Sequence, residues 1–92
     1  MKRKDVDMKK FEYIIKDSVG IHARPAGMLV KEAKNYGSEI TLSMNGKTAN
    51  ATRLMAIMGL GVKCGDAVEV TIDGQDEDVA YEGIKAFFEQ NL

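Results

Sequence analysis

A histidine and an arginine two positions apart are the residues of this 92-residue sequence that are best suited to chemistry. His22 is the only histidine, and it lies in the run Gly20-Ile21-His22-Ala23-Arg24-Pro25. An unprotonated imidazole nitrogen is a nucleophile, and an arginine guanidinium binds phosphate oxygens through several hydrogen bonds. If a helix starts directly after His22, its free N–H groups also attract an anion. The pattern therefore predicts a site that accepts a phosphoryl group.

Each of these residues alone has an ordinary explanation. A single histidine is usually a surface or helix-capping residue, Arg24 is a solvated arginine, and Pro25 is a first-turn proline. Their combination in one short run favours a phosphoryl site over these structural roles.

The composition gives little support to other classes of function. Thirteen Lys and Arg against fourteen Asp and Glu give a net charge of -1, so no excess of positive charge attracts nucleic acid or an anionic membrane. One histidine and one cysteine, Cys64, are too few for a usual zinc site or an intramolecular disulfide. We therefore expect no metal and no organic cofactor. Because no apolar run is long enough for a membrane span or a secretory signal, we expect a cytoplasmic protein without membrane insertion.

Two elements at the start of the chain must position the site. Apolar residues alternate over residues 11–15, which predicts a first strand after a charged extension of residues 1–10. Over residues 23–36 the spacing of the apolar residues becomes that of a helix face, which makes His22 the N-cap residue of a first helix. Gly37 is then its left-handed C-cap.

A hairpin is predicted in the middle of the chain. Asn45-Gly46 is a strong hairpin signal that favours a type I′ turn. This turn places Leu42 opposite Ala49 and Ile40 opposite Ala51, so large and small residues share one buried face.

The remaining elements complete an α+β fold. A fourth strand buries Val68, Val70 and Ile72, and a last helix starts near Asp76 with apolar positions at Val79, Ala80, Ile84, Phe87 and Phe88. The first helix connects the first strand to the second strand, which is the first strand of the hairpin. If this crossover is right-handed, the two strands are parallel with a gap between them, and the fourth strand fills the gap antiparallel to both. The prediction is an open-faced β-sandwich of order βαββαβα, with a four-stranded antiparallel sheet (order 1-4-2-3) and three helices on one face. The other face stays wet, with Glu12, Thr41, Thr48, Glu69 and Thr71.

A short helix with an apolar surplus is predicted between strands 3 and 4. It starts at Thr52 or Arg53 and ends at Gly59 and Gly61. Its apolar residues lie nearly all round it, so some of them stay exposed: Leu54, Met55, Ile57, Met58 and Leu60. We assign Leu54 mainly to the core, and Met55 and Met58 to the surface, where flexible thioether side chains adapt to different partners.

The run GIHARPA at residues 20–26 resembles the active-site signature of the HPr family, the histidine-containing phosphocarriers of the bacterial sugar phosphotransferase system. The resemblance extends over residues 11–92 and includes SEITLSMNGKTANA and LMAIMGLGV. It implies that His22 accepts a phosphoryl group on Nδ1 from phosphorylated enzyme I and passes it to the IIA unit of a sugar permease. It also implies that Arg24 and the backbone N–H groups of Ala23 and Arg24 stabilise the phosphoryl charge.

The same resemblance implies partner contacts on the short helix, at Leu54, Met55 and Met58. It implies a carrier without enzymatic turnover of its own, and we expect a monomer. Many Gram-positive members carry a regulatory serine where this sequence has Arg53, so we expect no regulation there, and the neighbouring Thr52 is interpreted as a helix N-cap. The alternative function is an HPr-like regulatory module that binds transcription factors or enzymes.

Overall fold

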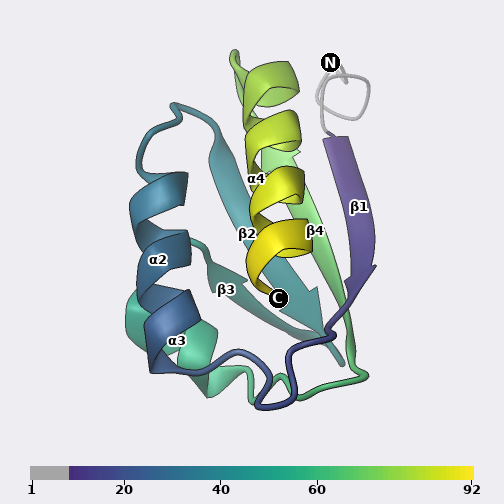
Figure 1. The fold of residues 1–92 in the computed structure, drawn as a ribbon. Coiled ribbons are helices and arrows are strands. Elements are labelled where there is room, and N and C mark those ends of the chain that lie inside the picture. Colours follow the sequence, from purple (N-terminus) through teal and green to yellow (C-terminus); the bar gives the residue numbers. More distant parts are fainter. Residues whose placement is uncertain (1–8) are drawn as a thin grey trace.

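The computed structural model describes residues 9–92, which form four strands and three helices in the order βαββαβα (Figure 1). Their bounds are β1 (Lys9–Ile14), α2 (Ala23–Ala33), β2 (Glu39–Met44), β3 (Lys47–Asn50), α3 (Leu54–Gly59), β4 (Ala67–Asp73) and α4 (Glu77–Asn91). The strands form one sheet of order β1-β4-β2-β3, and all neighbours are antiparallel. Both the predicted element order and the predicted sheet order are confirmed.

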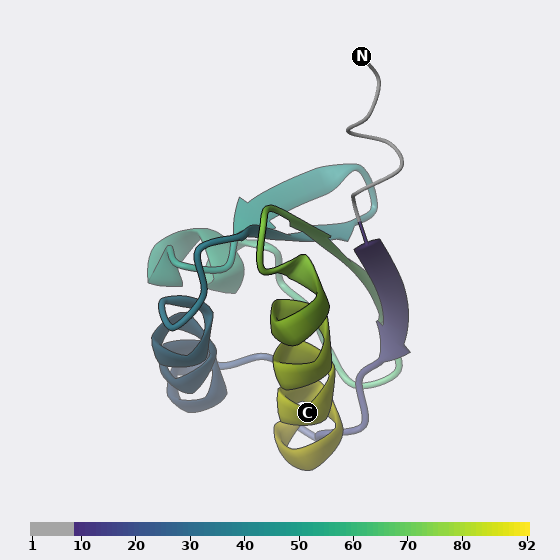
Figure 2. The same ribbon diagram turned by 90° about the horizontal axis from the view of Figure 1, so that it is seen from above.

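The core lies between the sheet and the helices. Figure 2 shows the three helices together on one side of the sheet. Alternate residues of the central strand β4, Val68, Val70 and Ile72, are fully buried because they face the helices. Of the five apolar positions predicted on α4, Ala80, Ile84, Phe87 and Phe88 are buried, whereas Val79 is 64% exposed. The four buried residues recur at helical spacing and form one face of α4, and Val79 lies outside that face.

The opposite face of the sheet is exposed to solvent, as predicted. Its residues are exposed or half-buried at Glu12, Thr41, Thr48, Glu69 and Thr71. The fold is thus an open-faced sandwich with one covered face.

The hairpin between β2 and β3 has the predicted geometry. Asn45 and Gly46 both have positive φ, 52° and 82°, as a type I′ turn requires. Leu42 pairs with Ala49, and the N–H of Ala51 donates to the Ile40 oxygen at 2.8 Å. The small residues therefore lie opposite the large ones.

The predicted start of the first strand, at residue 11, is wrong. β1 begins at Lys9, because Lys9 and Lys10 pair with Ile72 and Thr71 of β4. Residues 1–8 of the predicted extension lie outside the described residues.

The helix α2 ends at Ala33, three residues before the predicted Tyr36. The N–H groups of Asn35 and Tyr36 donate to oxygens three residues back, which tightens the chain out of the α-helix. Gly37 is not a left-handed cap, since the C-cap is Lys34 with a φ of −71°.

The segment after α2 is instead held by the start of α4. The N–H of Gly37 donates to Oδ2 of Asp76 at 2.8 Å, and the Ser38 hydroxyl donates to the other oxygen of the same carboxylate. These hydrogen bonds, that of Ser38 first, lower the pKa of the Asp76 carboxyl from its usual value. Asp76 therefore ties the α2–β2 connection to the N-terminus of α4.

The short helix α3 begins at Leu54, one residue after Arg53, which is the later of its two predicted starts. Arg53 is the N-cap residue and its side chain makes no capping hydrogen bond. Thr52 is therefore not the N-cap, because its hydroxyl and N–H donate to the Asn50 side chain at 2.6 Å and 2.9 Å. Gly61, with a φ of 67°, follows the helix where a left-handed residue is favoured.

Candidate functional site

The loop that carries His22 is fixed on both sides. The N–H of Asp17 donates to the backbone oxygen of Leu92 at 2.8 Å, and the N–H of Ile21 donates to the Val62 oxygen at 3.1 Å. Between them, Gly20 has a φ of 85°, and a Cβ atom there would lie 2.7 Å from the Cα of Lys63. A glycine is needed because the two loops approach so closely. His22 therefore enters α2 from a backbone with little freedom.

His22 is the N-cap residue of α2, as predicted, with an extended backbone (φ −119°) and no side-chain capping hydrogen bond. Its imidazole is half-buried and is not used to hold the helix. His22 thus caps the helix through its backbone alone, and its ring remains available for chemistry.

The first turn of α2 offers two backbone donors. Pro25 has no N–H, and the N–H of Ala26 already donates to the His22 oxygen at 2.9 Å. The N–H groups of Ala23 and Arg24 donate to no group among the described residues, and the first turn contains no acidic residue. This arrangement suits an anion, because free N–H groups at a helix N-terminus carry partial positive charge.

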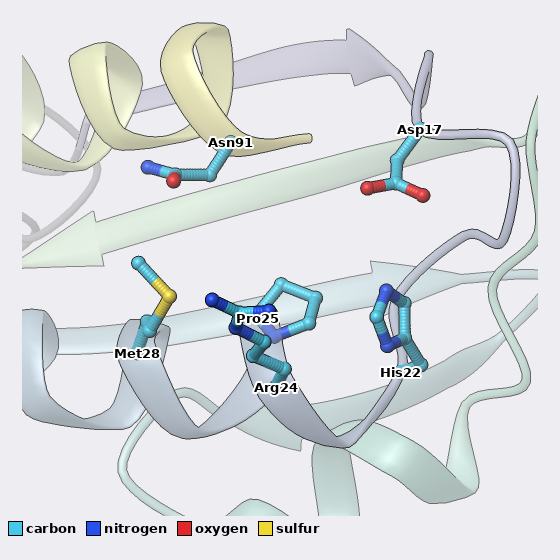
Figure 3. A pocket seen from close by; sticks show the side chains of 6 residues that line it. All are labelled: Asp17, His22, Arg24, Pro25, Met28 and Asn91. Atoms are coloured by element: carbon cyan, nitrogen blue, oxygen red, sulfur yellow. The ribbon is translucent and has the colours of Figure 1, made fainter.

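His22 and Arg24 lie together at an open pocket of about 290 Å³. Six residues line it: Asp17, His22, Arg24, Pro25, Met28 and Asn91 (Figure 3). Arg24 and Pro25 both come from the first turn of α2, where Arg24 is exposed and Pro25 is buried (Figure 3). The structure thus brings together the two residues that the sequence predicts for phosphoryl chemistry.

Sequence reasoning missed three residues of this pocket. Asp17 lies in the same loop as His22, and the run Asp17-Ser18-Val19-Gly20 signals a turn but no role in a pocket. Met28 lies on the exposed side of α2, one turn after Arg24, and helical spacing could have identified it. Asn91 comes from the end of α4 and no local signal places it here.

The predicted partner-contact residues form a separate apolar surface on α3. Leu54, Met55 and Met58, here called the α3 patch, are 38%, 77% and 38% exposed. The assignment of Leu54 mainly to the core is wrong, because α3 rests on the core through Ile57, which is fully buried. Figure 1 shows α3 beside the N-terminal part of α2, the end of the helix at which His22 is the N-cap residue.

Within residues 9–92, no three His, Cys, Asp or Glu residues are grouped so that they could hold a metal ion. Over the same range, none of the helices has the length and apolar character needed to cross a membrane.

Comparisons with known proteins agree with this geometry. Residues 9–90 match the model of the PTS-HPr family, described as the PTS HPr component phosphorylation site. The phosphocarrier protein HPr of Mycoplasma genitalium is 44% identical over 85 residues, which cover 91% of this chain and 97% of that protein.

Solved structures show the same relationship. A histidine-containing phosphocarrier protein from Mycoplasma has a TM-score of 0.86 and 40% identity, and the match covers 89% of this chain and 93% of that one. The Bacillus subtilis catabolite repression protein Crh is also similar, with a TM-score of 0.73, 32% identity and coverage of 87% and 92%. With its fold, its His22 pocket and a family model that spans nearly the whole chain, this protein belongs to the PTS-HPr family.

Proposed function

We propose that His22 is the phosphoryl acceptor of this chain and that Arg24 stabilises the transferring group. The chain is a phosphocarrier of the sugar phosphotransferase system, a protein substrate that receives and passes on a phosphoryl group without turnover of its own. The observation that supports His22 and Arg24 is their position in one open pocket, beside two backbone N–H groups that donate to no group within residues 9–92, and with an imidazole that makes no capping hydrogen bond.

The reaction is a transfer between two nitrogen atoms. The lone pair of Nδ1 of His22 forms a bond to the phosphorus of a phosphohistidine donor, and the donor's N–P bond breaks with its electron pair remaining on the donor ring. The N–H groups of Ala23 and Arg24, together with the Arg24 guanidinium, stabilise the negative charge of the phosphoryl oxygens. The reverse sequence of bonds transfers the group onward.

Enzyme I is the proposed donor and the IIA unit of a sugar permease the proposed acceptor. The α3 patch is the proposed contact surface for both, because three exposed apolar side chains on one short helix exceed what folding requires. Flexible methionines suit a surface that must fit two different proteins.

The experiment that tests the acceptor is labelling with enzyme I and radioactive phosphoenolpyruvate. The wild-type chain should take up label that is labile in acid and comparatively stable in base, and His22→Ala should take up none. The melting temperature of the variant should equal that of the wild type, because the His22 side chain makes no capping hydrogen bond. Undiminished labelling of His22→Ala would remove this residue from the mechanism.

The regulatory binding module is the less supported alternative. The similarity to Crh favours it, but the two phosphocarriers compared above are more similar in sequence. A wild-type chain that takes up no label but binds a transcription factor would favour this alternative.

A further inference from the structure

Asp17 is a fixed negative charge in the His22 pocket to which the proposed mechanism gives no role. Its N–H donates to the Leu92 oxygen at 2.8 Å, and its own backbone oxygen accepts from the N–H of Gly20 at 2.9 Å. Its Oδ1 accepts from the N–H of Val19 at 2.9 Å. Three hydrogen bonds therefore hold both the backbone and the carboxylate of Asp17 in place.

The second carboxylate oxygen of Asp17, Oδ2, has no hydrogen-bond donor in the part of the chain that the structure describes. Figure 3 shows the carboxylate and the imidazole of His22 directed toward each other across the pocket that both line. The carboxylate is thus a fixed negative charge on the side of the pocket that faces the ring.

The two sides of the imidazole consequently have opposite electrostatic surroundings. On one side is the Asp17 carboxylate, toward which Nε2 is directed in Figure 3. On the other side are the first turn of α2, with the N–H groups of Ala23 and Arg24, and the Arg24 guanidinium. A carboxylate attracts a ring N–H and repels a phosphoryl dianion, whereas helix N–H groups do the opposite.

We propose that Asp17 is a positioning residue that keeps the proton of the neutral His22 ring on Nε2 and so directs phosphorylation to Nδ1. This inference rests on the proposed acceptor role of His22 and extends it to the choice between the two nitrogens. The lone pair of Nδ1 forms the N–P bond while Nε2 keeps its proton, so no proton moves during transfer in either direction. Asp17 touches neither the phosphorus nor the leaving group, and a fixed acidic partner is a general way to select a histidine tautomer.

The first test measures the tautomer without any phosphoryl donor. ¹⁵N-histidine NMR spectra of the neutral ring should show Nε2–H as the main tautomer in the wild type. Asp17→Asn has nearly the same shape and keeps an Oδ1 acceptor for Val19, but it removes the charge. We expect the Nε2–H to Nδ1–H ratio to fall at least about threefold in this variant.

A matched control removes one negative charge elsewhere. Asp78→Asn breaks an exposed 3.1 Å pair with Lys9 in the first turn of α4, the opposite end of that helix from Asn91. It should leave the tautomer ratio as in the wild type, and Asp17→Glu, which restores the charge, should return the ratio toward it. An equal ratio in the wild type and Asp17→Asn would overturn the proposal, as would an equal change in Asp78→Asn.

The second test measures which nitrogen is phosphorylated. Phosphoramidate is used as a small donor, so that no donor protein decides the geometry, and the phosphohistidine isomers are separated after alkaline hydrolysis. The Nε2 isomer should form a larger share in Asp17→Asn than in the wild type, and an unchanged share would contradict the proposal. If the wild type is not phosphorylated on His22 at all, the proposed function fails, while the tautomer ratio still tests Asp17 independently.

Discussion

Replacing exposed Met55 by glutamate should separate partner binding from stability on α3. Met55 is 77% exposed, so only about a quarter of its side chain leaves water on folding. Full burial of a methionine contributes about 1.5–3 kcal/mol, so the lost burial is about 0.5 kcal/mol. The new carboxylate also lies in the first turn of α3, where the helix dipole favours a negative charge.

Ile57 provides the contrast on the same helix. It is fully buried, and Ile57→Ala should lower the free energy of unfolding by about 2–5 kcal/mol. Met58 is 38% exposed, so Met58→Glu should lie between the two, with about 1–2 kcal/mol of lost burial. For a domain of this size each 1 kcal/mol lowers the melting temperature by about 4–8 °C.

Calorimetry and titration with enzyme I on the same variants provide the assay. Met55→Glu should lower the melting temperature by less than about 4 °C. It should nevertheless weaken enzyme I binding at least about tenfold, or about 1.4 kcal/mol, because a charge is desolvated at an apolar contact. Wild-type affinity in both Met55→Glu and Met58→Glu would refute the assignment of the α3 patch to partner binding. A collapse of the melting temperature in Met55→Glu would refute the structural reasoning itself.

Arg24, Asp76 and Gly20 each lead to a separate prediction. Arg24→Ala should still be phosphorylated, but at least about tenfold more slowly, equivalent to about 1.4 kcal/mol of barrier, and quench-flow rates equal to the wild type would exclude its electrostatic role. Because hydrogen bonds from Ser38 and Gly37 lower the pKa of Asp76, its stabilising effect is complete above the ordinary carboxyl pKa of about 3.9 and is lost as the pH falls through the lower folded-state pKa. The difference in urea midpoint between the wild type and Asp76→Asn should therefore be constant near neutral pH and disappear in strong acid, and a difference that grows in acid would contradict this linkage. Gly20→Ala should lower the free energy of unfolding by more than about 2 kcal/mol, since φ is 85° and the new Cβ meets the Lys63 backbone. Gly59→Ala, whose Cβ has nothing within 4 Å, should be neutral or slightly stabilising in the same denaturation series.

The sequence by itself determines the elements that depend on neighbours along the chain. Asn45-Gly46 specifies its turn because few other residues adopt positive φ at both positions, and that turn sets the pairing of Leu42 with Ala49. Alternation within β4 identifies its buried face, and the handedness of the crossover then leaves few sheet orders possible. The link between His22 and Arg24 is equally local, because both lie at the start of one helix.

Long-range contacts decide what the sequence pattern could not. α2 ends earlier than predicted, and Gly37 and Ser38 of the segment that follows it donate hydrogen bonds to the carboxylate of Asp76. Asp76 is distant in the sequence, so the position of a glycine near the end of the helix does not indicate this contact. Val79 has an apolar side chain yet faces solvent, because the orientation of α4 on the sheet selects its buried face.

The full composition of the His22 pocket is likewise a product of tertiary structure. Asn91 joins it only because α4 folds back across the sheet to the loop that precedes α2, where Leu92 accepts hydrogen bonds from Lys16 and Asp17. The same contacts turn Asp17 from a turn residue into a charge that faces the imidazole. The chain order places the imidazole of His22 at the N-terminus of α2, but only the packing of distant segments brings the Asp17 carboxylate to the other side of that ring.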